Sequence, residues 1–171
     1  YVNDGSRDTT LQVMLGLQAA DPRAAVVNLS RNFGKEIALT AGLDHARAAE
    51  AIVVIDADLQ DPPEVIPALV ATWREGFDVV YAQRNTREGD TWMKKATAAG
   101  FYRVMQRLGG KVQLPPDTGD FRLMSRRAVD ALLKLREQHR FMKGLFAWIG
   151  FRSETIEFKV EQRAHGFRIA V

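Results

Sequence analysis

Two aspartates separated by one residue stand directly after an apolar run, a pattern typical of a divalent-metal site. Asp56 and Asp58 follow residues 51–55 (AIVVI), a β-branched run that predicts a buried strand. Residues two apart in extended chain project to the same side, which would bring the two carboxylates to about 5 Å from each other. At that distance they repel by roughly 3 kcal/mol, and a bound Mg²⁺ or Mn²⁺ relieves the repulsion. We therefore predict that Asp56 and Asp58 are metal ligands, and that Gln60 can reach the same ion or a phosphate. The alternative is that the two aspartates are solvated acids at the end of a strand.

The residues after this pair predict the start of a helix. Asp61-Pro62-Pro63-Glu64 has a capping residue, a proline at the first helical position and a glutamate three residues after the cap. We therefore interpret Asp61 as a helix cap. The carboxyl edge of an open α/β sheet is also where ligands bind, which favours a functional role for Asp56 and Asp58.

Two further strand-to-helix turns carry polar residues. Residues 3–10 (NDGSRDTT) are ordinary turn and cap chemistry, yet Asp4 is placed to accept a hydrogen bond from a base or ribose. In residues 31–35 (RNFGK), the first amides of a helix and Lys35 can face a phosphate. The chain has neither a P-loop nor the G-x-G-x-x-G pattern, which argues against a dinucleotide-dependent dehydrogenase.

The second half of the chain adds an acid and two basic residues. Arg84 follows the third predicted strand, at the same edge as Asp56 and Asp58. Asp120 and Arg122 flank Phe121 after a glycine-containing loop, and such a couple is either a structural ion pair or part of an active site. The three histidines show no metal-ligand spacing, so none is assigned a catalytic role.

Strand and helix patterns alternate along the chain. Apolar runs predict strands at 25–29, 51–55 and 77–82, and helical patterns cover 9–20, 35–49 and 64–75. This alternation predicts an α/β fold, a mostly parallel central sheet with flanking helices. Beyond it we expect an amphipathic helix at 91–108, a short strand at 121–124, a helix at 127–137, an apolar segment at 142–149 and an outer strand at 155–160.

Composition narrows the class of protein. The 171 residues are 46% hydrophobic, enough for one domain with a core, and contain no cysteine, which excludes disulfides and thiolate chemistry. The net charge of the chain is +3. A local surplus of basic residues between 84 and 111 favours binding of an anionic partner, and the alternative is a helix face that is simply solvated. The basic residues between 84 and 111 are Arg84, Arg87, Lys94, Lys95, Arg103, Arg107 and Lys111. No apolar stretch reaches membrane-spanning length.

Taken together, these segments resemble the family-2 inverting glycosyltransferases. Within that family they are similar to the polyprenyl-phosphate sugar transferases, the group of the dolichyl-phosphate mannose synthases and the bacterial undecaprenyl-phosphate glycosyltransferases. The matching segments follow in order over nearly the whole chain: VNDGSRDTT (2–10), RNFGKEIALTAGLDHA (31–46), DADLQDPPE (56–64), FYRVMQRLG (101–109), DTGDFRLMSRRAVDAL (117–132) and RFMKGLFAWIGF (140–151).

The resemblance implies a Rossmann-like GT-A fold and a role for each matching residue. Asp4 corresponds to the acid that contacts the base of the donor. Asp56 and Asp58 correspond to the pair that holds Mg²⁺ or Mn²⁺ on the diphosphate of a UDP- or GDP-sugar, with Gln60 assisting. Arg84 corresponds to a basic residue that meets a phosphate, and Asp120 to an acid near the sugar and acceptor, with Arg122 beside it. Asp58 and Asp120 are the expected catalytic residues. The other residues expected to bind substrate are Lys35, Lys94, Lys95 and Arg163.

The resemblance also implies a setting. The expected protein is a single catalytic domain over 1–171 that lacks its first strand and any C-terminal membrane segment, since Val2 reads as the tail of a strand and the motif at Arg163 lacks its usual Ser-Lys. It would act at the cytoplasmic face of a membrane on a polyprenyl phosphate, touching the surface through the segment 91–108, and would bind no nucleic acid. The alternatives are a non-catalytic nucleotide- or metal-binding module and a nucleotidyltransferase.

Overall fold

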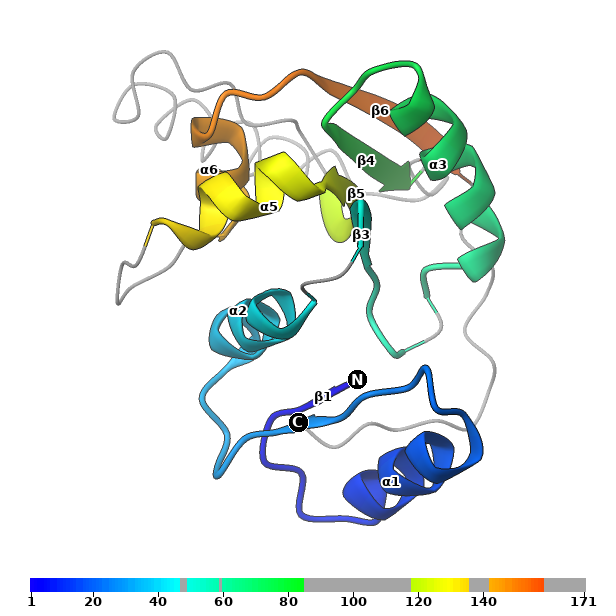
Figure 1. Ribbon diagram of the computed structural model, residues 1–171, viewed down its shortest axis with the longest axis vertical. Helices are drawn as coiled ribbons and strands as arrows, with labels where there is room; N and C mark the ends of the chain where they lie inside the picture. Colours follow the sequence, from blue (N-terminus) through cyan, green and yellow to red (C-terminus); the bar gives the residue numbers. More distant parts are fainter. Residues whose placement is uncertain (47–48, 59, 85–117, 136–141, 159–171) are drawn as a thin grey trace, which may run out of the picture. The chain divides into compact units, whose positions relative to one another are not determined.

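The structure, a computed structural model, describes residues 1–46, 49–58, 60–84, 118–135 and 142–158. The chain divides into two compact units (Figure 1). Tyr1–Ala49 with Leu133–Met142 form the β1/β2 unit, and Glu50–Leu132 with Lys143–Val171 form the four-strand unit. The expectation of a single catalytic domain concerns the whole chain and stays a prediction.

The β1/β2 unit is a small parallel β–α–β arrangement. Strands β1 (Val2–Asn3) and β2 (Val27–Asn28) pair in parallel with Val2 opposite Val27, and helix α1 (Thr10–Ala20) connects them. Helix α2 (Lys35–His45) follows β2 and contacts β1. It ends before the predicted residue 49, because the backbone leaves helical geometry at Ala46.

The four-strand unit contains a mixed sheet. Its strands are β3 (Ala51–Val54), β4 (Val79–Arg84), β5 (Thr118–Ser125) and β6 (Ser153–Phe158), in the order β3-β5-β4-β6. β5 runs antiparallel to both of its neighbours, and β4 runs parallel to β6. The α/β class is confirmed, but this sheet is not mostly parallel as the alternation of elements suggested. The difference arises because the strand expected at 121–124 inserts between β3 and β4.

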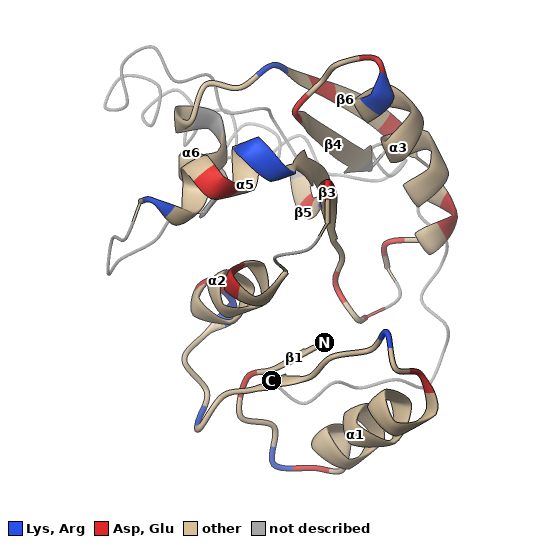
Figure 2. Cartoon of the chain, viewed as in Figure 1, with Lys and Arg blue, Asp and Glu red and all other residues tan. Residues whose placement is uncertain are grey.

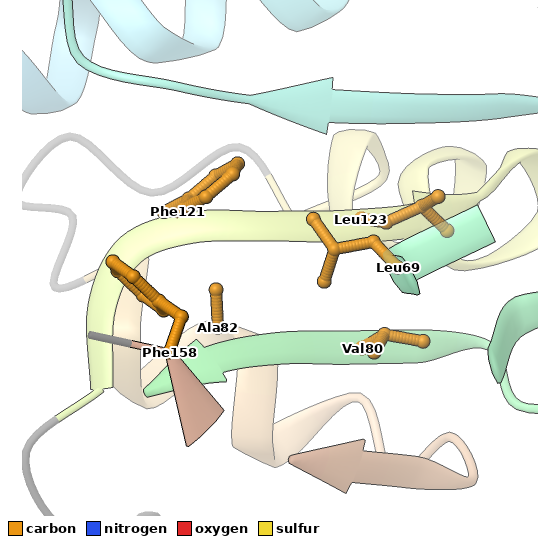
Figure 3. Close-up of a cluster of buried hydrophobic side chains, with 6 residues drawn as sticks. All are labelled: Leu69, Val80, Ala82, Phe121, Leu123 and Phe158. Atoms are coloured by element: carbon orange, nitrogen blue, oxygen red, sulfur yellow. The ribbon is translucent and has the colours of Figure 1, made fainter. Parts of the chain in front are cut away.

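Alternation along β5 divides the side chains between the two faces of this sheet. Phe121 and Leu123 lie on one face, in a buried cluster with Leu69, Val80, Ala82 and Phe158 (Figure 3). The rings of Phe121 and Phe158 meet edge to face with centroids 5.8 Å apart, an arrangement that aromatic pairs prefer. Arg122 and Met124 alternate with these residues, so they lie on the opposite face.

Helices accompany the sheet. The 3₁₀ turn η1 (Pro63–Val65) leads into α3 (Ile66–Arg74), which packs on β4, β5 and β6 and supplies Leu69 to the cluster. Helix α5 (Arg126–Leu133) follows β5 and buries Ala128, Val129 and Leu132. Helix α6 (Met142–Trp148) precedes β6. The basic helix expected at 91–108 lies outside the described residues.

Two predicted details of these helices can be checked. The assignment of Asp61 as the helix cap is wrong: Pro62 occupies the N-cap position of η1, without a side-chain capping bond, and Asp61 is buried just before it. Across the described residues, none of the helices is both long and apolar enough to span a bilayer.

Candidate active site

Three of the acids predicted to have a functional role lie at one edge of the four-strand sheet, the edge at which β3 and β4 end and β5 begins. The last pair between β3 and β5 joins Val54 to Arg122. Asp56 comes two residues after Val54, and Asp120 comes two residues before Arg122. Because the two strands are antiparallel, the end of β3 and the beginning of β5 lie at the same edge. β4 is also antiparallel to β5, so its last residue, Arg84, belongs to this edge as well.

The loop after β3 presents oxygen ligands at this edge. Figure 2 shows acidic positions along this loop, and Asp56, Asp58 and Gln60 are all partly exposed. One carboxylate oxygen of Asp58 accepts the backbone N–H of Gln60 at 3.0 Å, a local turn that aspartate commonly forms. This bond fixes one oxygen of Asp58 and leaves its second oxygen available for a ligand.

β5 carries an irregularity where it reaches the same edge. Tyr81 of β4 pairs with Arg122, yet Gln83 pairs with Thr118. Residues 119–121 therefore lie opposite Ala82 alone, which is a β-bulge. Bulges are frequent next to active sites, where they redirect a side chain. Here the bulge contains Asp120, whose side chain is 18% exposed.

The Arg122 side chain folds back onto this bulge. Its Nη2 donates to the carbonyl of Gly119 at 2.7 Å, and its Nε donates to the carbonyl of Asp120 at 3.1 Å. Nη2 also lies 3.4 Å from the Asp120 carboxylate. The guanidinium is 1% exposed and stacks on Phe146, 4.0 Å from the ring centroid. The opposite strand supplies Tyr81, with its centroid 5.2 Å away; burial raises the pKa of Tyr81, and the Arg122 charge opposes that shift.

In the β1/β2 unit, Asp4 joins two strand-to-helix turns. Its two carboxylate oxygens accept the backbone N–H groups of Phe33 and Gly34, at 2.7 and 2.9 Å. The turns also approach each other at Gly5, which has φ +70°, and where a Cβ would lie 2.4 Å from backbone atoms of Arg31 and Asn32. Asp4 is thus a structural acceptor, and its contact with a base stays a prediction.

The second of these turns exposes a cation and an aromatic ring. The Arg31 guanidinium lies over Phe33, 4.1 Å from the ring centroid, and both side chains are exposed. Lys35 is the first residue of α2 and is exposed too. Helix N-termini attract anions, and the phosphate contact of Lys35 stays a prediction.

The structure brings together one group of the predicted site residues. Asp56, Asp58, Gln60, Asp120 and Arg122 all lie at one edge of the four-strand unit, where β4 also ends at Arg84. Asp4 and Lys35 belong to the β1/β2 unit. Lys94, Lys95 and Arg163 lie outside the described residues. Within the described part of the chain, no group of three or more Asp, Glu, His or Cys side chains is arranged to hold a metal ion.

Sequence reasoning missed a polar cluster at the opposite end of β5. Buried Asp78 accepts hydrogen bonds from both Arg127 and the Ser125 hydroxyl, with Arg127 Nη2 at 2.6 Å and Ser125 Oγ at 2.8 Å. Ser125 Oγ also accepts the Ala128 N–H at 3.3 Å, as an N-cap of α5 would. These bonds, the Arg127 pair above all, lower the pKa of Asp78. The available signal was a lone acid in the apolar run FDVVYA (77–82).

Comparison with known sequences places the chain among glycosyltransferases. The family profile described as glycosyl transferase family 2 matches residues 1–133. An uncharacterized glycosyltransferase of Synechocystis is 53% identical over 165 residues, covering 96% of this chain and 51% of that protein. The bactoprenol glucosyl transferase of Shigella phage SfV is 42% identical over 166 residues, covering 97% and 53%. The chain thus spans about half the length of these relatives.

Solved structures agree on the fold. Glucosyl-3-phosphoglycerate synthase of Mycobacterium tuberculosis superposes with a TM-score of 0.55 at 23% identity, over 98% of this chain and 60% of that one. TarS of S. aureus gives 0.53 at 18% identity, over 91% and 47%. The expected GT-A glycosyltransferase fold is confirmed. With its profile match over 1–133 and its relatives at 42–53% identity, this chain belongs to glycosyl transferase family 2.

Proposed function

We propose that this chain is the catalytic part of a transferase that moves a sugar from a nucleoside-diphosphate donor onto a polyprenyl phosphate, with inversion at the anomeric carbon. The observation that carries the proposal is the meeting of Asp56 and Asp58 with Asp120 at one sheet edge of a family-2 glycosyltransferase. The acceptor is suggested by relatives that are named bactoprenol glucosyl transferases. Their similarity extends over 97% of the chain.

The oxygen ligands at this edge fit Mg²⁺ or Mn²⁺ when the substrate supplies the other ligands. Asp56 and Asp58 offer partly exposed carboxylates, and Gln60 adds an amide oxygen nearby. Mg²⁺ is commonly held by one or two carboxylates together with substrate phosphates, which agrees with the lack of a larger acid cluster among the described residues. When bound, such a cation would neutralise charge on the departing diphosphate. Asp56, Asp58 and Gln60 would hold it.

The residues of the chain itself would bind and orient the two substrates. The acceptor phosphate is already anionic near neutral pH, so its oxygen can attack without a strong general base. Asp120, at the beginning of β5, would orient the sugar or the acceptor. Arg84, at the end of β4, would bind a phosphate and raise the local concentration of the anionic substrates. We propose a phosphate contact for Lys35 because it begins helix α2. A base contact for Asp4 and a substrate contact for Arg163 are proposed on the resemblance alone.

We further propose that the reaction takes place at the cytoplasmic face of the membrane that holds the lipid acceptor. Lys94 and Lys95 would contact anionic head groups, since basic residues gain about 1 kcal/mol each near such a surface. Changing both lysines to glutamate should weaken binding of the full-length protein to anionic liposomes at low salt. Equal binding of variant and wild type would remove the membrane role from this segment.

The test of function is a transfer assay with defined substrates. The full-length protein is incubated with undecaprenyl phosphate, Mn²⁺ or Mg²⁺, and a panel of UDP- and GDP-sugars. We expect one donor to yield a lipid-phosphate sugar and a nucleoside diphosphate. Release of pyrophosphate would instead indicate a nucleotidyltransferase, and binding of nucleotide without turnover a non-catalytic module.

The metal assignment is tested with Asp58→Asn. Loss of one ligand carboxylate should reduce transfer by at least about 100-fold, without changing the thermal unfolding midpoint. Asp130→Asn is the matched control, because Asp130 is an exposed acid on α5 that pairs across the helix surface with Arg126. Transfer at the wild-type rate by Asp58→Asn, with metal present, would show that the assignment is wrong.

A further inference from the structure

Lys35 and Arg122 are both predicted to contact substrate, but Lys35 is exposed whereas Arg122 is buried. Its side chain is 1% exposed. Placing a guanidinium in the interior of a protein costs several kcal/mol unless its donors are satisfied. Arg122 meets that requirement with two backbone carbonyls, and its charge lies over two aromatic rings. The contacts of this arginine are therefore with the protein.

The carbonyls that Arg122 binds belong to the bulge. Regular pairing with β3 ends at Arg122, and pairing with β4 skips residues 119–121. The carbonyls of Gly119 and Asp120 therefore lie where the sheet ladder is interrupted, and a polar backbone group without a partner is costly to bury. Arg122 supplies those partners, at 2.7 and 3.1 Å. In this way a single side chain stabilises the backbone from which Asp120 projects.

We infer that Arg122 is a positioning residue: it locks the β5 bulge and so holds the Asp120 carboxylate at the sheet edge. This inference rests on the proposed function for the meaning of Asp120, and it departs from the expectation that Arg122 itself contacts substrate. The aromatic rings of Tyr81 and Phe146 hold the guanidinium in place. Small displacements of a group near the reacting atoms can cost about 100-fold in rate, so a loosened bulge should reduce turnover strongly.

The first experiment measures whether Arg122 acts through Asp120. Arg122→Lys keeps the charge but not the planar fork that reaches two carbonyls at once. We expect kcat for sugar transfer to fall about 100-fold, with little change in the donor KM. In an Asp120→Asn background, the same change should leave the remaining kcat unaltered. Equal loss in both backgrounds would overturn the inference and indicate a direct contact with substrate or a general structural role.

Two further variants test whether the loss of activity comes from the position of the Arg122 guanidinium. Phe146→Leu keeps an apolar side chain but removes the ring stacked on the guanidinium, and should give a smaller loss that also vanishes with Asp120→Asn. Arg126→Lys is the matched control, since Arg126 lies on α5 and pairs with the exposed Asp130 of the same helix. Activity of this control should equal that of wild type; a matching loss would show that any nearby arginine has the same effect.

A second measurement does not depend on catalysis. Amide hydrogen exchange of a peptide containing residues 118–121 should be faster in Arg122→Lys than in wild type and unchanged in Arg126→Lys. Unchanged exchange in Arg122→Lys would overturn the lock even if sugar transfer is observed. Conversely, faster exchange in a protein that transfers no sugar from any donor in the panel would support the lock and refute the proposed function.

Discussion

The strands of the four-strand unit are held by an apolar core, whereas the turns of the β1/β2 unit are held by polar contacts. Almost every fully buried apolar side chain among the described residues belongs to the first of these units, and Leu43 is the exception. In the β1/β2 unit, helix α1 has no buried residue, and Asp4 and Asn3 bridge neighbouring turns and strands through hydrogen bonds. The acids at the sheet edge therefore lie in or shortly after strands that share a buried apolar cluster, whereas Asp4 itself accepts the hydrogen bonds that join the turns of its own unit.

Truncation of a core side chain should have the largest effect on stability. Phe121→Ala removes an aromatic ring from the cluster with Leu69 and Phe158, and should lower the free energy of unfolding by about 3–5 kcal/mol. Phe33→Ala is the counterpart in the β1/β2 unit, where the ring is exposed, and should cost less than about 1 kcal/mol. Urea denaturation of both variants measures the contrast. Equal losses would mean that the two units are not stabilised differently.

Gly5→Ala should have the next largest effect on stability, and the strain it introduces lies in the β1/β2 unit. A Cβ there would lie 2.4 Å from backbone atoms and at a positive φ, so we expect a loss of about 2–3 kcal/mol. Gly16→Ala is the control, because Gly16 lies within α1 and an added Cβ there would meet no atom of the described residues within 4 Å beyond the helix's own backbone. That substitution should stabilise the protein by about 0.5–1 kcal/mol. A harmless Gly5→Ala would show that the two turns can separate.

Asp78→Asn should weaken the far end of β5 in a pH-dependent way. The hydrogen bonds from Arg127 lower the pKa of Asp78, so the ionised carboxylate stabilises the folded state above the pKa of an ordinary aspartate. That contribution is lost as the pH falls through the lowered value. Because Arg127 is 70% exposed, we expect a cost of only about 1–2 kcal/mol at pH 7.

The measurement for this variant is thermal unfolding of wild type and Asp78→Asn between pH 7 and pH 2. The difference between the two should shrink as the pH drops below about 4, where the carboxylate of Asp78 in the unfolded chain begins to protonate while the folded protein still holds it ionised. A difference that stays constant over this range would mean that the carboxylate charge is not what stabilises this end of β5.

The smallest effect is expected on α1. Val13 is 59% exposed, so Val13→Gln should change the free energy of unfolding by less than about 0.5 kcal/mol. The buried Leu69→Gln on α3 is the comparison and should be strongly destabilising. If Val13→Gln lowered the free energy of unfolding of the full-length protein by more than about 2 kcal/mol, another element would have to cover α1. The two units would then differ less in how far apolar burial stabilises them.

Local patterns predicted most of the elements. The β-branched run at 51–55 and the run at 77–82 became β3 and β4, and the helical patterns at 9–20 and 64–75 became α1 and α3. The boundaries shifted by a few residues, as at the end of α2, because helix ends depend on local backbone geometry that periodicity does not specify. The prediction of a mostly parallel sheet was wrong for the four-strand unit. Strand direction depends on which segments pair with each other, and these segments lie far apart in the sequence.

The D-x-D spacing and the apolar run before it are local features of residues 51–58, so they were enough to predict that oxygen ligands follow a buried strand. Family motifs added the expectation for Asp120. Only the tertiary structure decided that β5 lies between β3 and β4, which brings Asp120 to the same edge as Asp56. It also decided that Arg122 points inward onto its own bulge, because burial and backbone pairing arise from contacts between residues far apart in the chain.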